Sequence, residues 1–277
     1  MKKININLID SIKSTIFRNK TLRKTYFCSH PNTKYSITEI LNELIYVLKT
    51  GIAWRDIRGP INFNTLFWHH QLLSKNRIFK KTFDTLRNHF MKKNNINIII
   101  VDTTIISNKY GRQSIARNKL FKNKNCSKIS ALSDKNGVPL SLLFSDGRKH
   151  DLRFVRTHIR DIKGHIGESV LLGDRGYVSK RLKEELRSYQ IQLMVMKKRN
   201  MKDFGLFDKN IYKQRIFIEH LFQRLKCYRR LQTRYEASIM NFKSFTFLAS
   251  CILIHQHIKN SLLAKADKSG KNKNMQK

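Results

Sequence analysis

The sequence predicts a mixed α/β fold in which a five-stranded sheet is flanked by helices. Three strand-like segments in a row are followed by strand and helix in alternation, an order that favours a mixed sheet with helices on both faces. The first strand is nearly all β-branched and apolar, as expected of a central strand that is covered on both sides. Helical periodicity precedes this strand, so we expect a small all-helical domain before the α/β domain.

The all-helical domain is predicted over residues 36–93, after a basic N-terminal arm at residues 1–35. The arm has weak periodicity and is expected to be flexible or to hold an irregular first helix. Ser36 and Glu39 match a capping box, and apolar residues then recur at helical spacing up to Gly51. We therefore expect the first helix of this domain to start just after Ser36.

Two further helices are predicted in this domain. Asn64 is expected to cap one that runs to Leu73, and apolar residues indicate another over 78–90. Three short helices with a basic surface are typical of a helix-turn-helix-like DNA-binding domain, but also of a helical bundle with a solvated basic face. The residues expected to form this surface are His69, His70, Lys75, Arg77, Lys80 and Lys81.

The α/β domain is predicted over residues 94–260. Its second and third strands are separated by Asn136-Gly137, a pair that is a strong signal for a hairpin turn. Strands are expected at 96–105, 128–134, 138–145, 169–173 and 191–196, and helices at 151–162, 179–189, 209–230 and 238–259.

The charge of the chain points to a polyanionic partner. Lys and Arg number 56 against 19 Asp and Glu, which gives a formal net charge of +37. Nucleic acid is the commonest partner of such a protein, although a base-composition bias toward Lys and Asn would explain part of the excess. The Lys-rich residues 261–277 are expected to form a disordered basic tail.

From the sequence we expect no signal peptide, no membrane span and no zinc site. Its apolar stretches are far shorter than the roughly 20 residues that span a bilayer, and polar residues interrupt the N-terminal segment. The four cysteines lie far apart, without zinc-ligand spacing. We therefore expect a cytoplasmic protein that has no membrane partner.

Two aspartates end apolar segments that are predicted to be buried strands. Asp102 follows the letters IIIV, and Asp174 follows VLLG. A buried carboxylate is costly unless a positive group compensates for it. Each Asp alone is adequately explained as a helix cap or turn residue. If the two strands are neighbours in the sheet, however, the two carboxylates converge.

A third acid, Glu219, lies in a basic helical segment. At about 100° per residue, it shares one stripe of the helix with Tyr212, Arg215 and Lys226. This stripe runs along the edge of the apolar face, so Glu219 can point toward the two strand ends. The alternative is an ion pair between Arg215 and Glu219 on a solvated face, which leaves Tyr212 and Lys226 without a role.

Three converging carboxylates repel one another unless divalent cations hold them ionised. Carboxylate oxygens favour Mg²⁺ or Mn²⁺ over zinc. Two such ions can activate an attacking oxygen and stabilise the leaving oxygen of a phosphodiester. The surrounding positive charge would hold DNA phosphates against this site.

The sequence resembles the bacterial insertion-sequence DDE transposases, in particular insertion-sequence family five and the related family four. Their shared motif is Y-x2-R-x3-E-x6-K, which residues 212–226 match at every fixed position, and VDTT and DRGY occur at the two aspartates. The likeness covers about residues 36–258. Only 45 positions separate Asp174 from Glu219, which leaves little room for the β insertion of family four and favours family five.

The resemblance implies an RNase H-like catalytic domain in which Asp102, Asp174 and Glu219 bind two Mg²⁺ ions, with Mn²⁺ as a substitute. Water would cleave DNA at the terminal inverted repeats of the element, and the freed 3′-hydroxyl would attack target DNA. The family's activity implies a homodimer in the synaptic complex.

The resemblance also assigns Tyr212, Arg215 and Lys226 to contacts with transposon-end DNA. We further expect Arg175 and Lys128 to contact DNA. The basic segment 107–128 carries seven Lys or Arg and no acid, and is expected to form a mobile loop over the site or, alternatively, a merely solvated loop.

Three other acids have simpler explanations, and two other functions stay open. Asp134, Asp146 and Asp151 are explained as turn or cap residues, although Asp151 lies beside His150 at a predicted helix start. The competing functions are a non-catalytic DNA-binding protein, either a regulator or a decayed transposase, and a structure-selective nuclease on the same fold.

Overall fold

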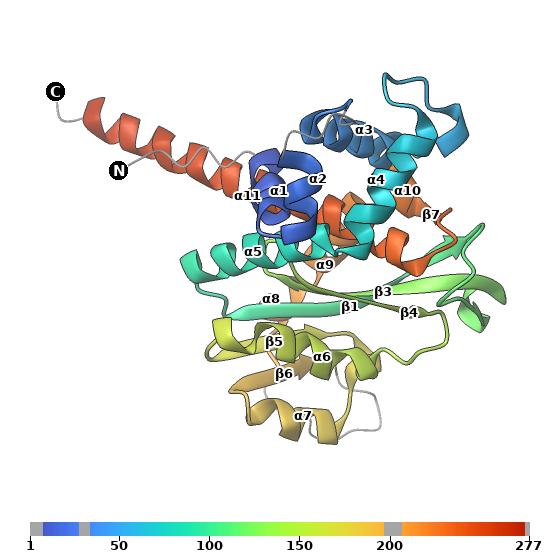
Figure 1. Ribbon diagram of the computed structural model, residues 1–277. Helices are drawn as coiled ribbons and strands as arrows, with labels where there is room; N and C mark the ends of the chain where they lie inside the picture. Colours follow the sequence, from blue (N-terminus) through green and yellow to red (C-terminus); the bar gives the residue numbers. More distant parts are fainter. Residues whose placement is uncertain (1–7, 28–33, 197–206, 275–277) are drawn as a thin grey trace.

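The structure is a computed structural model that describes residues 8–27, 34–196 and 207–274 (Figure 1). A mixed sheet lies at its centre. Helices α5, α9 and α11 lie on one side of the sheet and helices α6 and α7 on the other. This arrangement confirms the predicted mixed α/β fold. No helix in these ranges is long and apolar enough to cross a bilayer.

The sheet has the strand order β4-β3-β1-β5-β6, which is the order of an RNase H-like fold. The central strand β1 is antiparallel to β3 and parallel to β5. The five strands are β1 (Ile98–Asn108), β3 (Lys124–Asp134), β4 (Pro139–Asp146), β5 (Ser169–Gly173) and β6 (Ile191–Val195). Two short strands, β2 (Ala116–Asn118) and β7 (Thr233–Arg234), extend the expected five-stranded sheet to seven within the described residues.

The hairpin between β3 and β4 forms at the predicted Asn136-Gly137 pair. Gly137 has a φ of 68°, a left-handed conformation that glycine adopts without steric cost. The Asp134 carboxylate accepts hydrogen bonds from the backbone N–H groups of Asn136 and Val138. Asp134 is therefore the turn residue that the sequence indicates.

Segment 107–128 is not the loop that we expected. Strand β1 continues to Asn108, and β2 and the start of β3 pair with each other. The short helix η2 (Lys119–Phe121) is part of the same connection. Residues 107–108, 116–118 and 124–128 therefore belong to strands, and residues 109–115 connect β1 to β2 without strand or helix.

The predicted capping box of α3 (Ile37–Thr50) is confirmed. Ser36 accepts a hydrogen bond from the Glu39 backbone, and the Glu39 side chain accepts one from Ser36. The next helix, α4 (Phe63–Lys75), is capped by Asn62 and not by Asn64, because the Asn62 side chain accepts from the Asn64 N–H. Helix α5 spans Ile78–Lys93.

Helices also form in the segment expected to be an arm. Helices α1 (Leu8–Phe17) and α2 (Lys20–Phe27) bury Leu8, Ile12 and Leu22. A flexible arm is therefore wrong for this segment. Its few apolar residues are spaced so that they pack against the rest of the helical layer, and their low density hid the pattern.

The predicted helix at 209–230 is interrupted. It is divided into α8 (Lys209–Lys213), α9 (Ile216–Lys226) and α10 (Arg229–Gln232). At the first break, the backbone N–H groups of Gln214 and Arg215 donate to carbonyls three residues earlier, which tightens the turn. The final helix, α11, spans Ile239–Asn274, so helix replaces most of the disordered tail that we expected.

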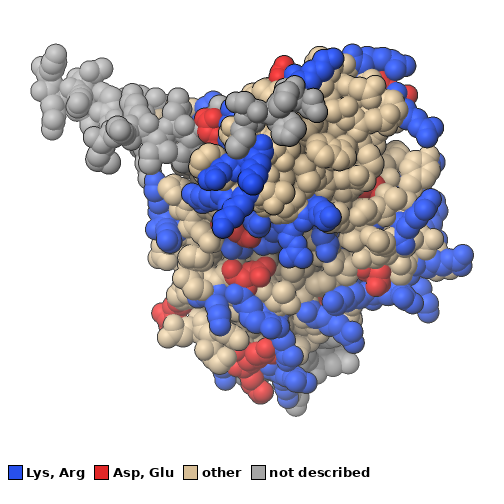
Figure 2. Space-filling view, viewed as in Figure 1, with Lys and Arg blue, Asp and Glu red and all other residues tan. Residues whose placement is uncertain are grey.

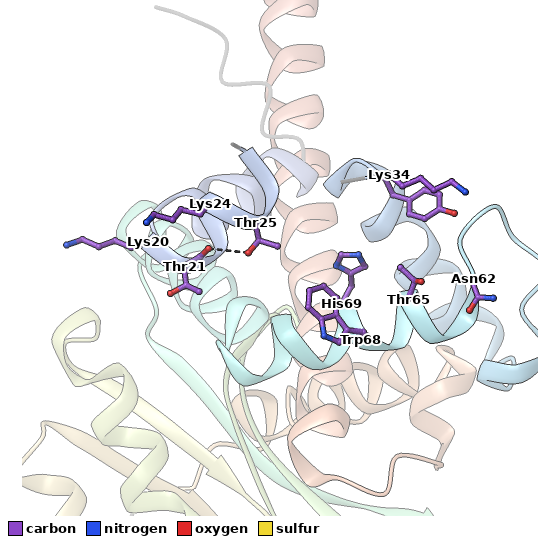
Figure 3. Close-up of a pocket in the computed structure, with 10 residues that line it drawn as sticks. Lys20, Thr21, Lys24, Thr25, Lys34, Asn62, Thr65, Trp68 and His69 are labelled. Carbon is purple, nitrogen blue, oxygen red and sulfur yellow. Dashed lines mark hydrogen bonds between the residues drawn. The ribbon is translucent and has the colours of Figure 1, made fainter. Parts of the chain in front are cut away.

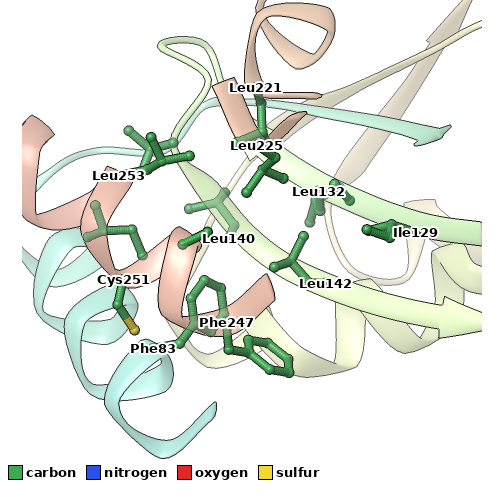
Figure 4. Close-up of a cluster of buried hydrophobic side chains, with 14 of the residues drawn as sticks. Phe83, Ile129, Leu132, Leu140, Leu142, Leu221, Leu225, Phe247, Cys251 and Leu253 are labelled. Atoms are coloured by element: carbon green, nitrogen blue, oxygen red, sulfur yellow. The ribbon is translucent and has the colours of Figure 1, made fainter. Parts of the chain in front are cut away.

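The helical region and the sheet share one hydrophobic core (Figure 4). Phe83 of α5 and Phe247 of α11 pack with their ring centroids 5.3 Å apart. The core is therefore continuous across residue 93, and the division of the chain into two domains stays a prediction. The figure labels Phe83, Ile129, Leu132, Leu140, Leu142, Leu221, Leu225, Phe247, Cys251 and Leu253.

His69 and His70 are buried, so their predicted place on the exposed basic surface is wrong. The ring of His70 stacks on Phe245 at 4.1 Å, and neither ring nitrogen has a hydrogen-bond partner among the described residues. Burial, together with the charge of Arg230, lowers the pKa of His70 to about 3. The unfolded chain binds this proton near pH 6.5, so the free energy of unfolding falls as the pH drops below that value.

Replacing His70 by phenylalanine is expected to reduce the acid sensitivity of the protein. His70 alone should lower the free energy of unfolding by about 2 kcal/mol between pH 8 and pH 5, and His70→Phe should remove that loss while keeping the ring contact. Urea unfolding at the two pH values measures the difference. His165→Phe in η3 (Lys163–His165) is the control. An unchanged pH dependence in His70→Phe would contradict the expectation.

Candidate active site

Asp102 lies in the middle of β1, and not at the strand end that the sequence suggested. Parallel pairing between β1 and β5 covers Ile98–Ile100 and stops there, while Asp102 is still paired with Ala131 of β3. The apolar run of β1 ends at Val101, just after the last residue that pairs with β5, although the strand continues to Asn108. The side chain of Asp102 is 22% exposed.

Asp174 directly follows the last residue of β5. Its side chain accepts a hydrogen bond of 2.8 Å from the N–H of Gly176 and caps the short helix η4 (Arg175–Tyr177). The simple interpretation of Asp174 as a cap is therefore correct as far as it goes. The carboxylate is nevertheless exposed at the end of a strand that neighbours β1.

Arg215 joins two of the three predicted acids. Its guanidinium donates to Asp102 Oδ2 at 3.1 Å and to Glu219 Oε1 at 2.6 Å. The ion pair between Arg215 and Glu219 that the sequence allowed is present, but the same guanidinium reaches Asp102, 113 residues earlier. The break between α8 and α9 places Arg215 over β1, where one side chain can meet both acids.

Tyr212 ties α8 to the strand that carries Asp174. Its hydroxyl donates a hydrogen bond of 3.2 Å to the carbonyl oxygen of Gly173. Since Gly173 precedes Asp174, this bond fixes the motif helix beside the second aspartate. The structure therefore places Tyr212, Arg215 and Glu219 beside the point where the pairing between β1 and β5 ends.

Asp102 is the acid whose protonation is most perturbed in this group. The pKa of Asp102 is raised to about 6, chiefly by burial and to a smaller extent by the negative charges of Asp174 and Asp151, while the Thr103 N–H and Arg215 act in the opposite direction. Asp102 and Asp174 each lie two residues beyond Ile100 and Leu172, the last paired residues of the neighbouring strands β1 and β5. A bound cation would favour the ionised form of Asp102.

The donor set suits a hard divalent cation, but it is not assembled as a metal site in this structure. Within the described ranges, no three His, Cys, Asp or Glu side chains are grouped so that they could hold one metal ion. The Arg215 guanidinium pairs with both Asp102 and Glu219. Positive charge is therefore already supplied to two of the acids, by a side chain in place of an ion.

Three further residues were predicted to contact DNA. Arg175 is exposed beside Asp174, with its Nη2 2.9 Å from Met196 Sδ. Lys226 is half-buried, which lowers its pKa, and lies seven residues after Glu219, roughly 10 Å along the helix axis. The motif thus spreads its basic groups along α9 and does not gather them all at the carboxylates.

Lys128 does not fit its predicted role. It is 8% exposed, and its ammonium group lies 2.7 Å from Asp151 Oδ1 and 2.8 Å from the carbonyl oxygen of Lys149. A direct DNA contact by Lys128 is therefore wrong for this conformation. The side chain of Lys128 points from β3 toward the start of α6 (Leu152–Ile162). The position of Lys128 in the sequence did not indicate this direction.

Near the site, the sequence analysis explained Asp151 as a cap or turn residue and did not consider Tyr177. Asp151 makes no capping bond and instead pairs with Lys128, and its charge acts on Asp102. Tyr177 is 1% exposed, its hydroxyl has no described partner, and burial raises its pKa, as do the charges of Asp102, Asp151 and Asp174. The signals available were His150-Asp151 before a helix and the tyrosine of DRGY.

The chain is similar to known transposases. The transposase DDE domain family matches residues 93–254. The transposase assigned to insertion sequence element IS402 of Burkholderia cepacia is 27% identical over 157 residues, which cover 54% of this chain and 72% of that protein.

Solved structures give weaker likenesses. The piggyBac transposase synaptic complex with hairpin DNA aligns with a TM-score of 0.47 at 11% identity, over 90% of this chain and 64% of that chain. The Mos1 mariner paired end complex with Mn aligns with a TM-score of 0.27 at 10% identity, over 83% of this chain and all of that chain. Because the family match covers more than half of the 277 residues, the protein belongs to the transposase DDE domain family and is a DDE-type DNA transposase that depends on divalent metal ions.

Proposed function

We propose that the protein is an insertion-sequence transposase of family five that binds terminal inverted repeats, cleaves them, and joins the 3′-hydroxyl ends to target DNA. The observation that carries this proposal is the meeting of Asp102 and Glu219 at Arg215, together with the hydrogen bond from Tyr212 to Gly173, the residue before Asp174. Residues far apart in the chain, each from a separate motif, contribute acids to one place. The short interval between Asp174 and Glu219 supports family five.

Asp102, Asp174 and Glu219 are the residues that would hold two Mg²⁺ ions, with Mn²⁺ as a substitute. When bound, these ions would activate water and then the 3′-hydroxyl for attack on phosphorus, and stabilise the departing oxygen. In cleavage, the oxygen of water would bond to phosphorus as the bond from phosphorus to the 3′-oxygen breaks, which leaves a 3′-hydroxyl and a 5′-phosphate. In joining, that 3′-hydroxyl oxygen would bond to a phosphorus of target DNA as the bond from this phosphorus to its own 3′-oxygen breaks. The all-oxygen donor set fits these ions.

The protein side chains would position DNA around the acids. For the acids to bind ions, Arg215 must leave the position between Asp102 and Glu219, and a DNA phosphate is a suitable new partner for its guanidinium. Arg175 is exposed next to Asp174, where it would hold the scissile strand. Lys226 would hold the backbone farther along α9, and Tyr212 would fix α8 and contact end DNA.

The surface charge supports DNA as the substrate. Lys and Arg side chains cover much of the face shown in Figure 2, from the helical layer to α6 and α7. Such a surface attracts phosphates at long range. Two transposon ends must be held together during the reaction, so we propose a homodimer in the synaptic complex. This protein would work in the bacterial cytoplasm, on the nucleoid.

Strand cleavage and joining test the proposal directly. Purified protein is incubated with labelled inverted-repeat DNA, target plasmid and Mg²⁺, and products are separated on denaturing gels. We expect nicked ends and joined products that disappear when the metal is chelated. Tight binding without metal-dependent nicking would point to a non-catalytic DNA-binding protein, and cutting of branched DNA without joining would point to a nuclease.

Replacing Arg215 by glutamine is expected to separate metal binding from DNA binding. Without the guanidinium, Asp102 and Glu219 are released, so Mn²⁺ should bind to the DNA-free protein roughly threefold to tenfold more tightly. End-DNA affinity should fall, because a charged contact is lost. Electron paramagnetic resonance of free Mn²⁺ measures the first effect, and gel shift the second.

Arg156 provides a matched control for this variant. It pairs with Glu185 of α7 (Lys180–Arg187) at 2.7 Å, away from the acids of the site. Arg156→Gln also releases one carboxylate and should leave Mn²⁺ binding unchanged. Equal Mn²⁺ affinity in Arg215→Gln and the wild-type protein would contradict the role given to Arg215.

A further inference from the structure

A basic cavity lies in the helical layer, and none of its lining residues belongs to the candidate active site. Its volume is about 1110 Å³, slightly above the roughly 300–1,000 Å³ that is typical of ligand pockets. Helix α2 forms one side, and Lys34 and Asn62 lie on the other, with Trp68 and His69 of α4 between them (Figure 3). The cavity can therefore admit a group larger than a single ion.

The lining combines positive charge with neutral hydrogen-bonding groups. Lys20 and Lys24 of α2 and Lys34 before α3 are exposed at its rim. No acid is among the lining residues, and the other polar side chains, apart from Trp68, are Thr21, Thr25, Tyr35, Asn62, Thr65 and His69. Three ammonium groups without a nearby carboxylate in the lining set are suited to phosphates, which each need only a point charge.

An exposed aromatic side chain lies between these lysines. Trp68 is 51% exposed, so about half of the side chain is accessible to a ligand. The His69 ring lies against Trp68, with centroids 4.8 Å apart at 73°, and His69 Nδ1 is 2.8 Å from the Tyr26 hydroxyl. The Trp68 ring is thus supported from within the protein while half of its surface stays open.

This combination fits an unpaired nucleotide better than a duplex. In a duplex the base faces are stacked on one another and only base edges and phosphates reach a protein. An unpaired base offers its face, and stacking on an aromatic ring stabilises binding by about 1–3 kcal/mol per base. The lysines would hold the phosphates on either side of that base.

We propose that the cavity between α2 and α4 binds an unpaired nucleotide of DNA, with the base stacked on Trp68 and its phosphates held by Lys20, Lys24 and Lys34. Such nucleotides arise wherever strand ends fray or are cut, and their capture would keep a processed end on the protein. The inference rests on the proposed function only in taking DNA as ligand. It requires no strand cleavage.

Binding of two matched DNA probes tests the inference with the full chain, without metal. One probe is a blunt duplex, and the other is the same duplex with a short oligothymidine overhang. We expect the wild-type protein to bind the overhang probe about tenfold more tightly. Trp68→Ala should bring the two affinities within about twofold, while blunt-duplex binding reports that the variant is folded.

The lysines and a control aromatic complete the test. In the Lys20→Ala/Lys24→Ala variant, the salt dependence of overhang binding should weaken by about 1.4 in log–log slope, or 0.7 for each lost single-strand phosphate contact. Tyr46→Ala removes another exposed aromatic, 49% exposed on α3, and should keep the overhang preference.

Three results would overturn the inference: equal wild-type affinity for both probes, an overhang preference retained in Trp68→Ala, or the same loss in Tyr46→Ala. If the lysine variant lowers the affinity for both probes equally, the proposed contacts between these lysines and the phosphates of the unpaired nucleotide are wrong. None of these results bears on the catalytic acids, and loss of cleavage in variants of those acids leaves overhang binding untouched.

Discussion

Asp102→Asn is expected to abolish metal-dependent strand cleavage while end-DNA binding is retained. Asparagine keeps the size of the side chain but cannot supply the negative charge that would hold a divalent ion beside Glu219 and Asp174. Loss of about 4 kcal/mol of transition-state stabilisation corresponds to about a 10³-fold slower reaction. Single-turnover cleavage of inverted-repeat DNA measures the rate, and gel shift measures binding.

Two companion variants and one control make this result specific. Asp174→Asn and Glu219→Gln should show losses of similar size, because a two-ion arrangement needs all three acids. Asp56→Asn changes the same charge on an exposed residue of η1 (Trp54–Asp56) in the helical layer, and should cleave normally. Wild-type rates in any of the three acid variants would exclude that acid from catalysis.

The thermal stability of Asp102→Asn gives a second readout. Burial of the Asp102 carboxylate opposes its ionisation, so its neutral replacement removes a desolvated charge. Arg215 keeps Glu219 as a partner. We therefore expect the melting temperature to stay within a few degrees of the wild-type value, which separates a loss of chemistry from a loss of folding.

The strands and the order of the acids could be predicted because burial shapes local sequence. A strand covered on both faces needs a continuous apolar run, and such runs marked β1 and β5 clearly. The hairpin was equally clear, because only a few residue pairs suit its turn. The convergence of Asp102 and Asp174 followed once two buried strands were taken as neighbours.

What the sequence could not predict depends on contacts between distant segments. Asp102 lies just beyond the point where the pairing between β1 and β5 ends, and not at the end of β1. Lys128 has the charge of a DNA-binding residue, yet Asp151 and Lys149 hold it inside the protein. The break at Gln214 and Arg215 lacks proline or glycine, so no local signal identified it.

Arg230 forms a buried ion pair and also links α10 to the helical layer. Arg230 Nε donates to Glu236 Oε1 at 2.7 Å, and the two side chains are only 4% and 2% exposed. Arg230 Nη1 also donates to the carbonyl oxygen of Ile52 at 2.8 Å, and its guanidinium lies over the Trp54 ring at 5.4 Å. One side chain thus links α10 with the end of α3.

Replacing Arg230 by methionine is expected to destabilise the protein by about 3–5 kcal/mol. The change leaves the Glu236 carboxylate buried without its cation, and Glu236 Oε2 already has no partner in the described residues. In a chain of this size, that loss lowers the melting temperature by roughly 6–20 °C. Calorimetry and urea unfolding measure the two quantities.

The double variant Arg230→Met/Glu236→Met distinguishes an unpaired charge from a loss of packing. If the cost of Arg230→Met comes from the stranded carboxylate, removing that carboxylate should restore most of the stability, because apolar side chains of similar volume replace buried ion pairs well. Arg229→Met, on the exposed side of α10, should change stability by less than about 0.5 kcal/mol. A double variant as unstable as the sum of the single variants would mean that Arg230 stabilises the protein through Ile52 and the aromatic rings, and not through Glu236.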